Sequence, residues 1–288
     1  MGLNTFFVVV EALFGFLSNS LALVADAGHN LSDVLGLFIA WGASLLVKRR
    51  STQRHTYGYR RSSILAALAN AVFLLVAIGA IAWEAIKRFG NPDPVQGGTL
   101  ITVALVGIAI NGVTALMFMS GRKHDLNIRG AYLHMAADAA VSAGVVLAGI
   151  AIVFTGWPWI DPVVSLLIVL VIFMGTWGLL RDSVNLALDA VPAGINSADV
   201  EDYLKSIPQV ADVHDLHIWA MSTTETALTA HLIVRDPQQV DDGMLKRAID
   251  DMQEMFGIEH STLQVESGDP AHPCSYCVPA ASAAGHKV

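Results

Sequence analysis

Four stretches of the chain contain no charged residue and are long enough to cross a lipid bilayer. They are residues 62–83, 95–121, 139–160 and 162–180. About 20 apolar residues in a helix cross the hydrocarbon core of a membrane. Two further segments, 3–25 and 27–47, qualify if a few ionisable side chains are tolerated. These side chains are Glu11, His29 and Asp33. The sequence therefore predicts six transmembrane helices.

The chain changes character after residue 189. Residues 190–288 carry 15 Asp and Glu against five Lys and Arg, together with six of the ten His and both Cys. Only 15% of the whole chain is charged, whereas a soluble domain has about 25% charged residues. We therefore expect three parts: a six-helix transmembrane domain at 1–189, a compact soluble domain at 190–266, and an irregular tail with Cys and His at 267–288.

The positions of Lys and Arg predict the orientation in the membrane. The connection at 48–61 carries six Lys and Arg in fourteen residues, and the connection at 121–129 carries three. The connections at 17–20 and 155–161 carry none. Cytoplasmic loops are enriched in cations, so both termini, and with them the domain at 190–266, are expected in the cytoplasm.

The soluble domain is predicted to follow the order αββαβ, with a small sheet and helices on one face, as in ferredoxin-like (metallochaperone-like) domains. Asn196 or Ser197 can cap a first helix, which Pro208 ends. Segments rich in Val and Ile, or with alternating apolar residues, indicate strands. Apolar residues that recur every three to four positions indicate a second helix. The expected strands are 210–221, 225–235 and 258–265, and the second helix is 239–256.

The pairs His29–Asp33 and His134–Asp138 lie inside two of the predicted spans. Side chains at i and i+4 share one face of a helix, and ionisable residues at membrane depth usually face a functional interior. One such pair could equally be a polar contact between helices. Two identical pairs supply two imidazoles and two carboxylates, a complete tetrahedral set for Zn²⁺ with matching charge.

Five longer stretches resemble a known family in sequence and in order. They read SNSLALVADAGHNLSD, HTYGYRRSSILAALAN, LNIRGAYLHMAADAAVS, WIDPVVSLLI and VHDLHIWA. The chain resembles the cation diffusion facilitator family over nearly its whole length, and especially the zinc-exporting branch. The resemblance implies six transmembrane helices, a cytoplasmic αββαβ domain, a homodimer, and exchange of Zn²⁺ for protons by alternating access. It also places the transport site on His29, Asp33, His134 and Asp138.

The resemblance implies a second zinc site in the cytoplasmic domain. Family members bind structural or regulatory zinc there through histidines, and vesicular zinc transporters have a similar pattern of His, Glu and a C-terminal C-x-x-C. The matching positions are His214, His231, His260, Glu266, Cys274 and Cys277. The alternative interpretation is that these are surface histidines on a sheet edge and a loose cysteine tail.

Two weaker signals complete the membrane half. His55 matches the first histidine of a loop metal site in some family members, but Tyr59 stands at the second, so we expect a basic loop that faces lipid instead. Glu11, Asn70 and Asn111 are polar groups at membrane depth, and we expect them to hydrogen-bond between helices. The alternative for Glu11 is a role in proton access.

The leading hypothesis is a non-enzymatic, proton-coupled Zn²⁺ exporter in a bacterial inner membrane, with export of cadmium, cobalt or nickel as an alternative. An intramembrane metalloprotease would need an H-E-x-x-H helix, and neither His29 nor His134 is followed by Glu. A membrane-tethered metal sensor would need no ionisable pairs in its spans. The expected partners are Zn²⁺, protons, the bilayer and a second copy of the chain. Nucleic acid is not an expected partner, because the sequence lacks the excess of Lys and Arg that a nucleic-acid-binding surface needs.

Overall fold

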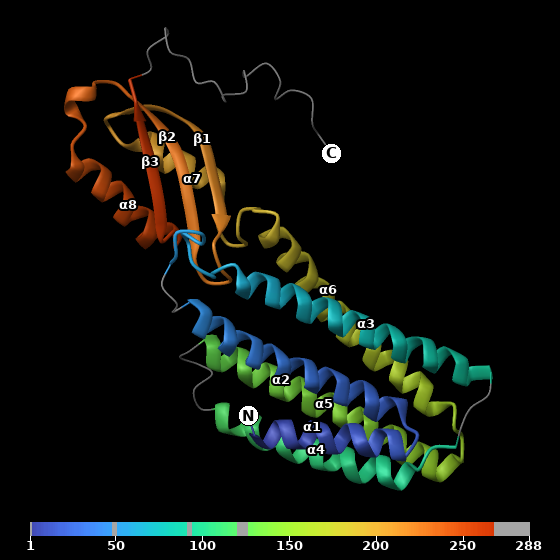
Figure 1. The fold of residues 1–288 in the computed structure, drawn as a ribbon. Coiled ribbons are helices and arrows are strands. Elements are labelled where there is room, and N and C mark those ends of the chain that lie inside the picture. The colour runs from blue at the N-terminus through green and yellow to red at the C-terminus, as the bar shows by residue number, and fades with distance from the viewer. Residues whose placement is uncertain (1, 48–50, 91–93, 120–125, 268–288) are drawn as a thin grey trace. The chain divides into compact units, whose positions relative to one another are not determined.

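The computed structural model describes residues 2–47, 51–90, 94–119 and 126–267 (Figure 1). The chain divides into two compact units. The helical unit comprises Met1–Gly42 and Ala66–Leu180, and the sheet unit comprises Ala43–Leu65 and Arg181–Val288. The domain boundaries at 189 and 266 stay predictions. Cys274 and Cys277 lie outside the described residues.

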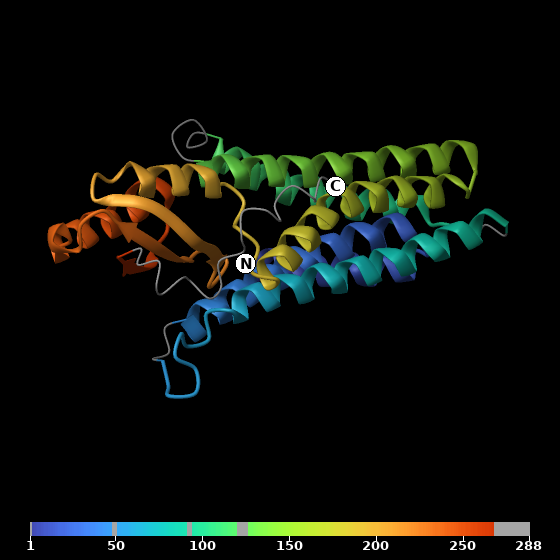
Figure 2. The same cartoon turned by 90° about the horizontal axis from the view of Figure 1, so that it is seen from above.

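Six helices are present where six were expected, and they run side by side (Figure 2). They are α1 (Gly2–Leu17), α2 (Leu21–Val47), α3 (Ser62–Gly90), α4 (Gly97–Phe118), α5 (Leu126–Thr155) and α6 (Ile160–Ala187). Among the described residues, α3 to α6 contain segments long and apolar enough to cross a membrane. The apolar part of α1, Thr5–Leu17, is shorter, so membrane crossing by α1 and α2 stays a prediction.

The expected connection at 17–20 is a tight turn between α1 and α2, so the apolar stretch at 3–25 runs past the end of α1 into α2. Asn19 in this turn has φ 56°, a left-handed conformation that Asn tolerates. Asp161 of α6 accepts hydrogen bonds from Ser20 Oγ at 2.6 Å and from the Leu21 amide at 2.8 Å. A carboxylate from another helix therefore caps the positive end of α2.

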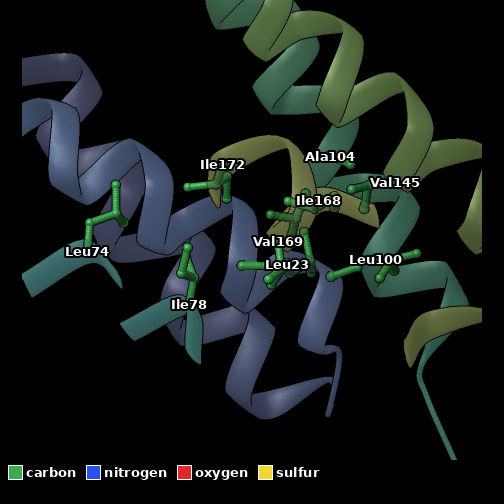
Figure 3. Packing of buried hydrophobic residues seen from close by; sticks show 12 residues of the cluster. Leu23, Leu74, Ile78, Leu100, Ala104, Val145, Ile168, Val169 and Ile172 are labelled. Atoms are coloured by element: carbon green, nitrogen blue, oxygen red, sulfur yellow. The ribbon is translucent and has the colours of Figure 1, made fainter. Parts of the chain in front are cut away.

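Aliphatic side chains fill the centre of the helical unit (Figure 3). They come from α2, α3, α4, α5 and α6 and include Leu23, Leu74, Ile78, Leu100, Ala104, Val145, Ile168, Val169 and Ile172. Glycines let α4 and α5 approach closely. A Cβ added at Gly149 would lie 2.6 Å from Leu100 Cδ2 and 3.2 Å from the Gly97 oxygen. Small residues at such contacts are typical of helices that pack in lipid.

The sheet unit confirms the predicted αββαβ order. Its elements are α7 (Ser197–Ser206), β1 (Val210–Ala220), β2 (Thr226–Val234), a 3-10 turn (Pro237–Gln239), α8 (Asp242–Phe256) and β3 (His260–Glu266). β2 lies in the middle, antiparallel to β1 and parallel to β3 (Figure 1). α7 and α8 contact each other as well as the sheet, so they cover the same face.

Local signals explain where the helices of the sheet unit begin. The Asn196 side chain accepts a hydrogen bond from the Ala198 amide at 3.1 Å, which confirms the predicted cap of α7. The second helix begins later than the expected residue 239. Pro237 opens a separate turn, and the Asp241 carboxylate accepts from the Met244 amide at 2.7 Å. Asp at this position is a strong start signal for a helix.

The basic connection before α3 contacts acidic residues of the sheet unit. Arg60 Nη1 lies 3.1 Å from Glu225 Oε2, and Arg61 pairs with Asp189. The expectation of a purely lipid-facing loop is therefore incomplete, since these two arginines have protein partners.

Candidate metal centres

Two helices bring the four predicted transport ligands together. His29 and Asp33 lie one turn apart on α2, and His134 and Asp138 lie one turn apart on α5. We call these four residues the helix cluster. Four distances between histidine Nε2 atoms and carboxylate oxygens define it: His29–Asp33 3.7 Å, His29–Asp138 3.4 Å, His134–Asp33 3.2 Å and His134–Asp138 3.7 Å.

The spacing of the helix cluster suits a tetrahedral ion. Nitrogen and oxygen ligands lie about 2.0 Å from Zn²⁺, which puts neighbouring ligand atoms about 3.3 Å apart. Each histidine Nε2 is within 3.2–3.7 Å of both carboxylates. Ligand atoms of His29, Asp33 and Asp138 all lie within 4.8 Å of one another. The His134 ring lies 6.0 Å from the His29 ring at an interplanar angle of 77°, so His134 is the ligand that must move to complete the tetrahedron.

Two cavities meet at the helix cluster. A cavity of 340 Å³ is lined by Asp33, His134 and Asp138 together with asparagines of α2, α3 and α4. A second cavity of 250 Å³ is lined by all four cluster residues and by the middle of α6, between Ile168 and Leu179. Asp138 is 3% exposed, whereas the His134 side chain is 43% exposed. The site is therefore anchored by a buried carboxylate and is open at one histidine.

The asparagines of the first cavity are Asn30, Asn70 and Asn111. Asn70 hydrogen-bonds with Ser32, its Nδ2 lying 3.3 Å from Ser32 Oγ. Hydrogen bonding between helices was predicted for Asn70, and this contact confirms it. The structure adds that Asn70 and Asn111 line a cavity at the ligands, a position that the sequence alone did not indicate.

A second group of possible ligands lies on the sheet. His214 of β1 pairs with His231 of β2 in the strand register, and Glu266 ends β3. Glu266 Oε2 lies 3.1 Å from His214 Nε2, and Glu266 Oε1 lies 2.9 Å from His231 Nδ1. We call these three residues the sheet cluster. Three protein ligands leave the fourth position of a tetrahedral ion open.

Asp215 is a neighbour of the sheet cluster that the sequence reasoning missed. It lies in a bulge of β1 between His214 and His217 and has φ 51°. Its carboxylate oxygens lie 3.6 Å from His231 Nε2 and 3.0 Å from His217 Nε2. A carboxylate on the second nitrogen of a ligating imidazole fixes the tautomer and the ring orientation. The sequence signal that could have identified Asp215 is its position directly after the predicted ligand His214.

Glu266 is electrostatically suited to bind a cation. Burial by itself would raise its pKa, but hydrogen bonds with Gln264 and His214 lower the pKa below the usual value for glutamate. The carboxylate is therefore ionised throughout the neutral range.

The other residues proposed for the cytoplasmic site lie elsewhere or outside the described residues. His260 begins β3 and pairs with Ala227, whereas Gln264 pairs with His231. Six residues of strand, about 20 Å, separate His260 from Glu266, so the protomer does not bring His260 to the sheet cluster. Its ring instead lies 5.7 Å from that of Tyr57.

Comparison with protein families matches both parts of the chain. Residues 1–186 match the cation efflux transmembrane domain, and residues 192–268 match the cytoplasmic domain of cation efflux proteins.

Three relatives of known name align over most of the chain. The zinc transporter ZitB of Escherichia coli (strain K12) is 38% identical over 94% of this chain and 86% of its own. The cadmium, cobalt and zinc/H⁺-K⁺ antiporter of Bacillus subtilis (strain 168) is 36% identical over 91% and 86%. The metal cation efflux system protein CzcD of Cupriavidus metallidurans is 36% identical over 92% and 84%. The chain is therefore a multi-pass membrane protein that belongs to the cation efflux family, also called the cation diffusion facilitator family.

Proposed function

We propose that this protein exports Zn²⁺ from the cytoplasm in exchange for protons, with the helix cluster as its transport site. The observation that carries the proposal is that two helices bring His29, Asp33, His134 and Asp138 together, with each histidine Nε2 3.2–3.7 Å from both carboxylates, close to the spacing of ligand atoms around zinc.

The charges of the helix cluster support coupling to protons. Two carboxylates and two neutral imidazoles around Zn²⁺ carry no net charge, which suits a site among membrane-spanning helices. When the ion leaves, the two carboxylates are left uncompensated. Metal and protons compete for the same lone pairs, so protons replace the ion. Only the neutral imidazole coordinates a metal, so protonation of either histidine competes directly with the ion.

The two cavities support alternating access. An ion held by the helix cluster borders both the 340 Å³ cavity and the 250 Å³ cavity. A change that opens one cavity and closes the other exposes the ion to one side of the membrane at a time.

The names of the relatives support zinc as the first substrate. The Escherichia coli relative is named a zinc transporter, and the Bacillus subtilis relative is named for cadmium, cobalt and zinc. Cadmium, cobalt and nickel are the alternative substrates of this chain.

We place the protein in the bacterial inner membrane as a homodimer, with both termini and the sheet unit in the cytoplasm. The six Lys and Arg of residues 48–61 support this orientation. The match of residues 192–268 to the cytoplasmic domain of the family supports the position of the sheet unit. In this arrangement the sheet cluster holds a structural or regulatory Zn²⁺ ion.

Reconstitution in liposomes tests the function directly. The full chain is inserted into vesicles that enclose a zinc-sensitive dye, and a pH gradient is imposed with the acidic side inside. We expect zinc uptake that collapses when the gradient is dissipated. The variant that tests the site is Asp33→Asn, which keeps the size of the side chain but removes the charge of one ligand. Uptake by Asp33→Asn at the wild-type rate contradicts the assignment of the transport site.

A further inference from the structure

Besides Asp161, which caps α2, two acidic residues outside the helix cluster are completely buried among the helices. Glu11 of α1 and Asp26 of α2 are both 0% exposed. Asn30 Nδ2 donates to Glu11 Oε2 at 3.0 Å, and Ser142 Oγ donates to Asp26 Oδ2 at 3.1 Å. The other two oxygens, Glu11 Oε1 and Asp26 Oδ1, have no hydrogen-bond donor. Each carboxyl group is thus half satisfied.

The two carboxyl groups are close enough to hydrogen-bond to each other when one of them is protonated. The titratable groups that act on the pair from neighbouring positions are His29 of α2 and Asp138 of α5. No Lys or Arg occurs in the sequences of α1, α2 or α4, and the α5 sequence contains only Arg129. Two ionised carboxylates without a cation are strongly unfavourable in such a place.

The packing around the pair leaves little room for a metal ion. Phe7 is 4% exposed, and a Cβ added at Gly107 would lie 3.0 Å from both the Phe7 ring and Ser142 Oγ. The described residues that line the two cavities at the helix cluster include neither Glu11 nor Asp26. A metal ion would need four or more ligand atoms at this point, whereas a proton needs only two oxygens.

We propose that Glu11 and Asp26 form a proton-binding site, separate from the metal ligands, which holds a shared proton and releases it when the divalent cation binds. The proposal rests on the proposed function, because it names a proton that is exchanged. The proton leaves the carboxyl O–H as H⁺ and leaves a carboxylate behind. It returns to the same oxygen after the cation has gone, and no other bond changes.

The position of the pair explains how the cation acts on it. Asp138 acts electrostatically on both carboxyl groups, and His29 acts on Asp26. Asn30, which donates to Glu11, also lines the cavity at the ligands. Ser142 lies one turn after Asp138 on the same face of α5. A divalent cation at the helix cluster adds two positive charges beside the pair, and positive charge favours the ionised form of a carboxyl group.

Infrared difference spectroscopy tests the site without requiring transport. Spectra of the full chain in lipid are compared with and without Zn²⁺ at neutral pH. We expect zinc to remove a carbonyl band of a protonated carboxylic acid. Most of this change should be lost in Glu11→Gln and in Asp26→Asn. The matched control is Glu84→Gln, which changes an exposed acidic residue beside Lys87 on α3. An identical band change in the wild type and both pair variants overturns the proposal.

A third variant guards against misfolding of the other two. Ser142→Ala removes the donor to Asp26 but keeps both carboxyl groups. Because both carboxyl groups remain, we expect zinc to remove the carbonyl band in Ser142→Ala as it does in the wild type. Absence of a zinc-sensitive band in a folded Ser142→Ala protein counts against the site.

Counting protons and zinc ions separates the proton site from a metal site. We expect Glu11→Gln to bind as many zinc ions per protomer as the wild type but to release fewer protons per ion. Loss of a bound zinc ion in Glu11→Gln would show that the pair is a metal ligand and overturns the proposal. Failure of the wild type to move zinc in liposomes would refute the proposed function alone, because the infrared and binding measurements do not depend on transport.

Discussion

The helix cluster and the sheet cluster both place two histidines beside carboxylates, but the chain assembles them differently. In the helix cluster each histidine has its carboxylate on the same helix, four residues later. In the sheet cluster His214, His231 and Glu266 come from three different strands and meet only through the strand register. The first arrangement is encoded by local spacing, and the second is encoded by the pairing of distant segments.

The two clusters also differ in their surroundings. Asp138 is 3% exposed, and two cavities border the helix cluster. Glu266 is 27% exposed at the end of a strand. A site that must take up and release an ion benefits from a buried charge with open space beside it, whereas a site that holds an ion needs only fixed ligands. The difference suggests transport for the helix cluster and a structural or regulatory ion for the sheet cluster.

The largest effect is expected from removing one ligand of the helix cluster. In His134→Ala or Asp138→Ala, the ion has only three protein ligands, and we expect zinc transport to fall to background. Loss of an outer-shell partner alone costs about 10- to 100-fold in metal affinity, so loss of a direct ligand should exceed this. Zinc-dye uptake in liposomes measures the effect, and His217→Ala on the exposed side of β1 is the control. Near-normal uptake by either ligand variant would remove the helix cluster from the pathway.

The next largest effect is expected from a substitution in the sheet cluster, which should change zinc binding but not zinc transport. We expect His231→Ala to lose zinc at the sheet cluster while transport stays measurable. The measurement is the zinc content per protomer, made in an Asp138→Ala background so that the helix cluster does not contribute. Asp215→Asn tests the neighbour of His231, and we expect it to weaken zinc binding by about 10-fold. A zinc content unchanged by His231→Ala would show that the sheet cluster binds no ion.

The same difference explains what the sequence could and could not predict. The i, i+4 spacing was enough to group His29 with Asp33 and His134 with Asp138, because helix geometry is local. The grouping of His260 with Glu266 rested on resemblance, and the register places them at opposite ends of β3. Asp26 was missed because it falls between the two expected spans, 3–25 and 27–47. The sequence did contain one signal: Asp26 and Asn30 are four residues apart, which places them on the same face of α2.

Selectivity is expected to change more mildly than activity. In His29→Asp the helix cluster would contain three carboxylates, which can bind an ion through one or two oxygens. Such a shell can expand, whereas two imidazoles and two carboxylates favour a compact tetrahedron. We expect the zinc-to-cadmium preference to fall roughly tenfold, the change that about 1.4 kcal/mol produces. Paired zinc and cadmium uptake measures it. An active variant with the wild-type preference would show that the packing around the site, and not the ligand type, sets selectivity.

Acidification should affect the sheet cluster through its histidines and not through Glu266. The pKa of Glu266 is lowered, so this carboxylate remains ionised at neutral pH, whereas protons compete with zinc for the imidazole nitrogens of His214 and His231. We expect zinc affinity in the Asp138→Ala background to fall as the pH drops below neutral. A lowered folded-state pKa also means that ionised Glu266 stabilises the fold at neutral pH and that this contribution is lost as the pH falls through the acid range. Glu266→Gln should weaken zinc binding but keep the midpoint of the pH dependence. A midpoint that moves into the acid range would make a carboxylate the controlling group.

The smallest effect is expected at His260, and it tests the register that separates the two ends of β3. His260 is exposed, and its ring contacts Tyr57 and not the sheet cluster. A surface substitution of this kind usually changes the free energy of unfolding by less than about 0.5 kcal/mol. We therefore expect His260→Ala in the Asp138→Ala background to bind as much zinc as the background alone, whereas His231→Ala loses it. Because the proposed homodimer would bring a second chain close, the comparison is made at concentrations above and below dimer dissociation. Equal losses in His260→Ala and His231→Ala at both concentrations would place His260 among the ligands of its own protomer and contradict the strand pairing described above.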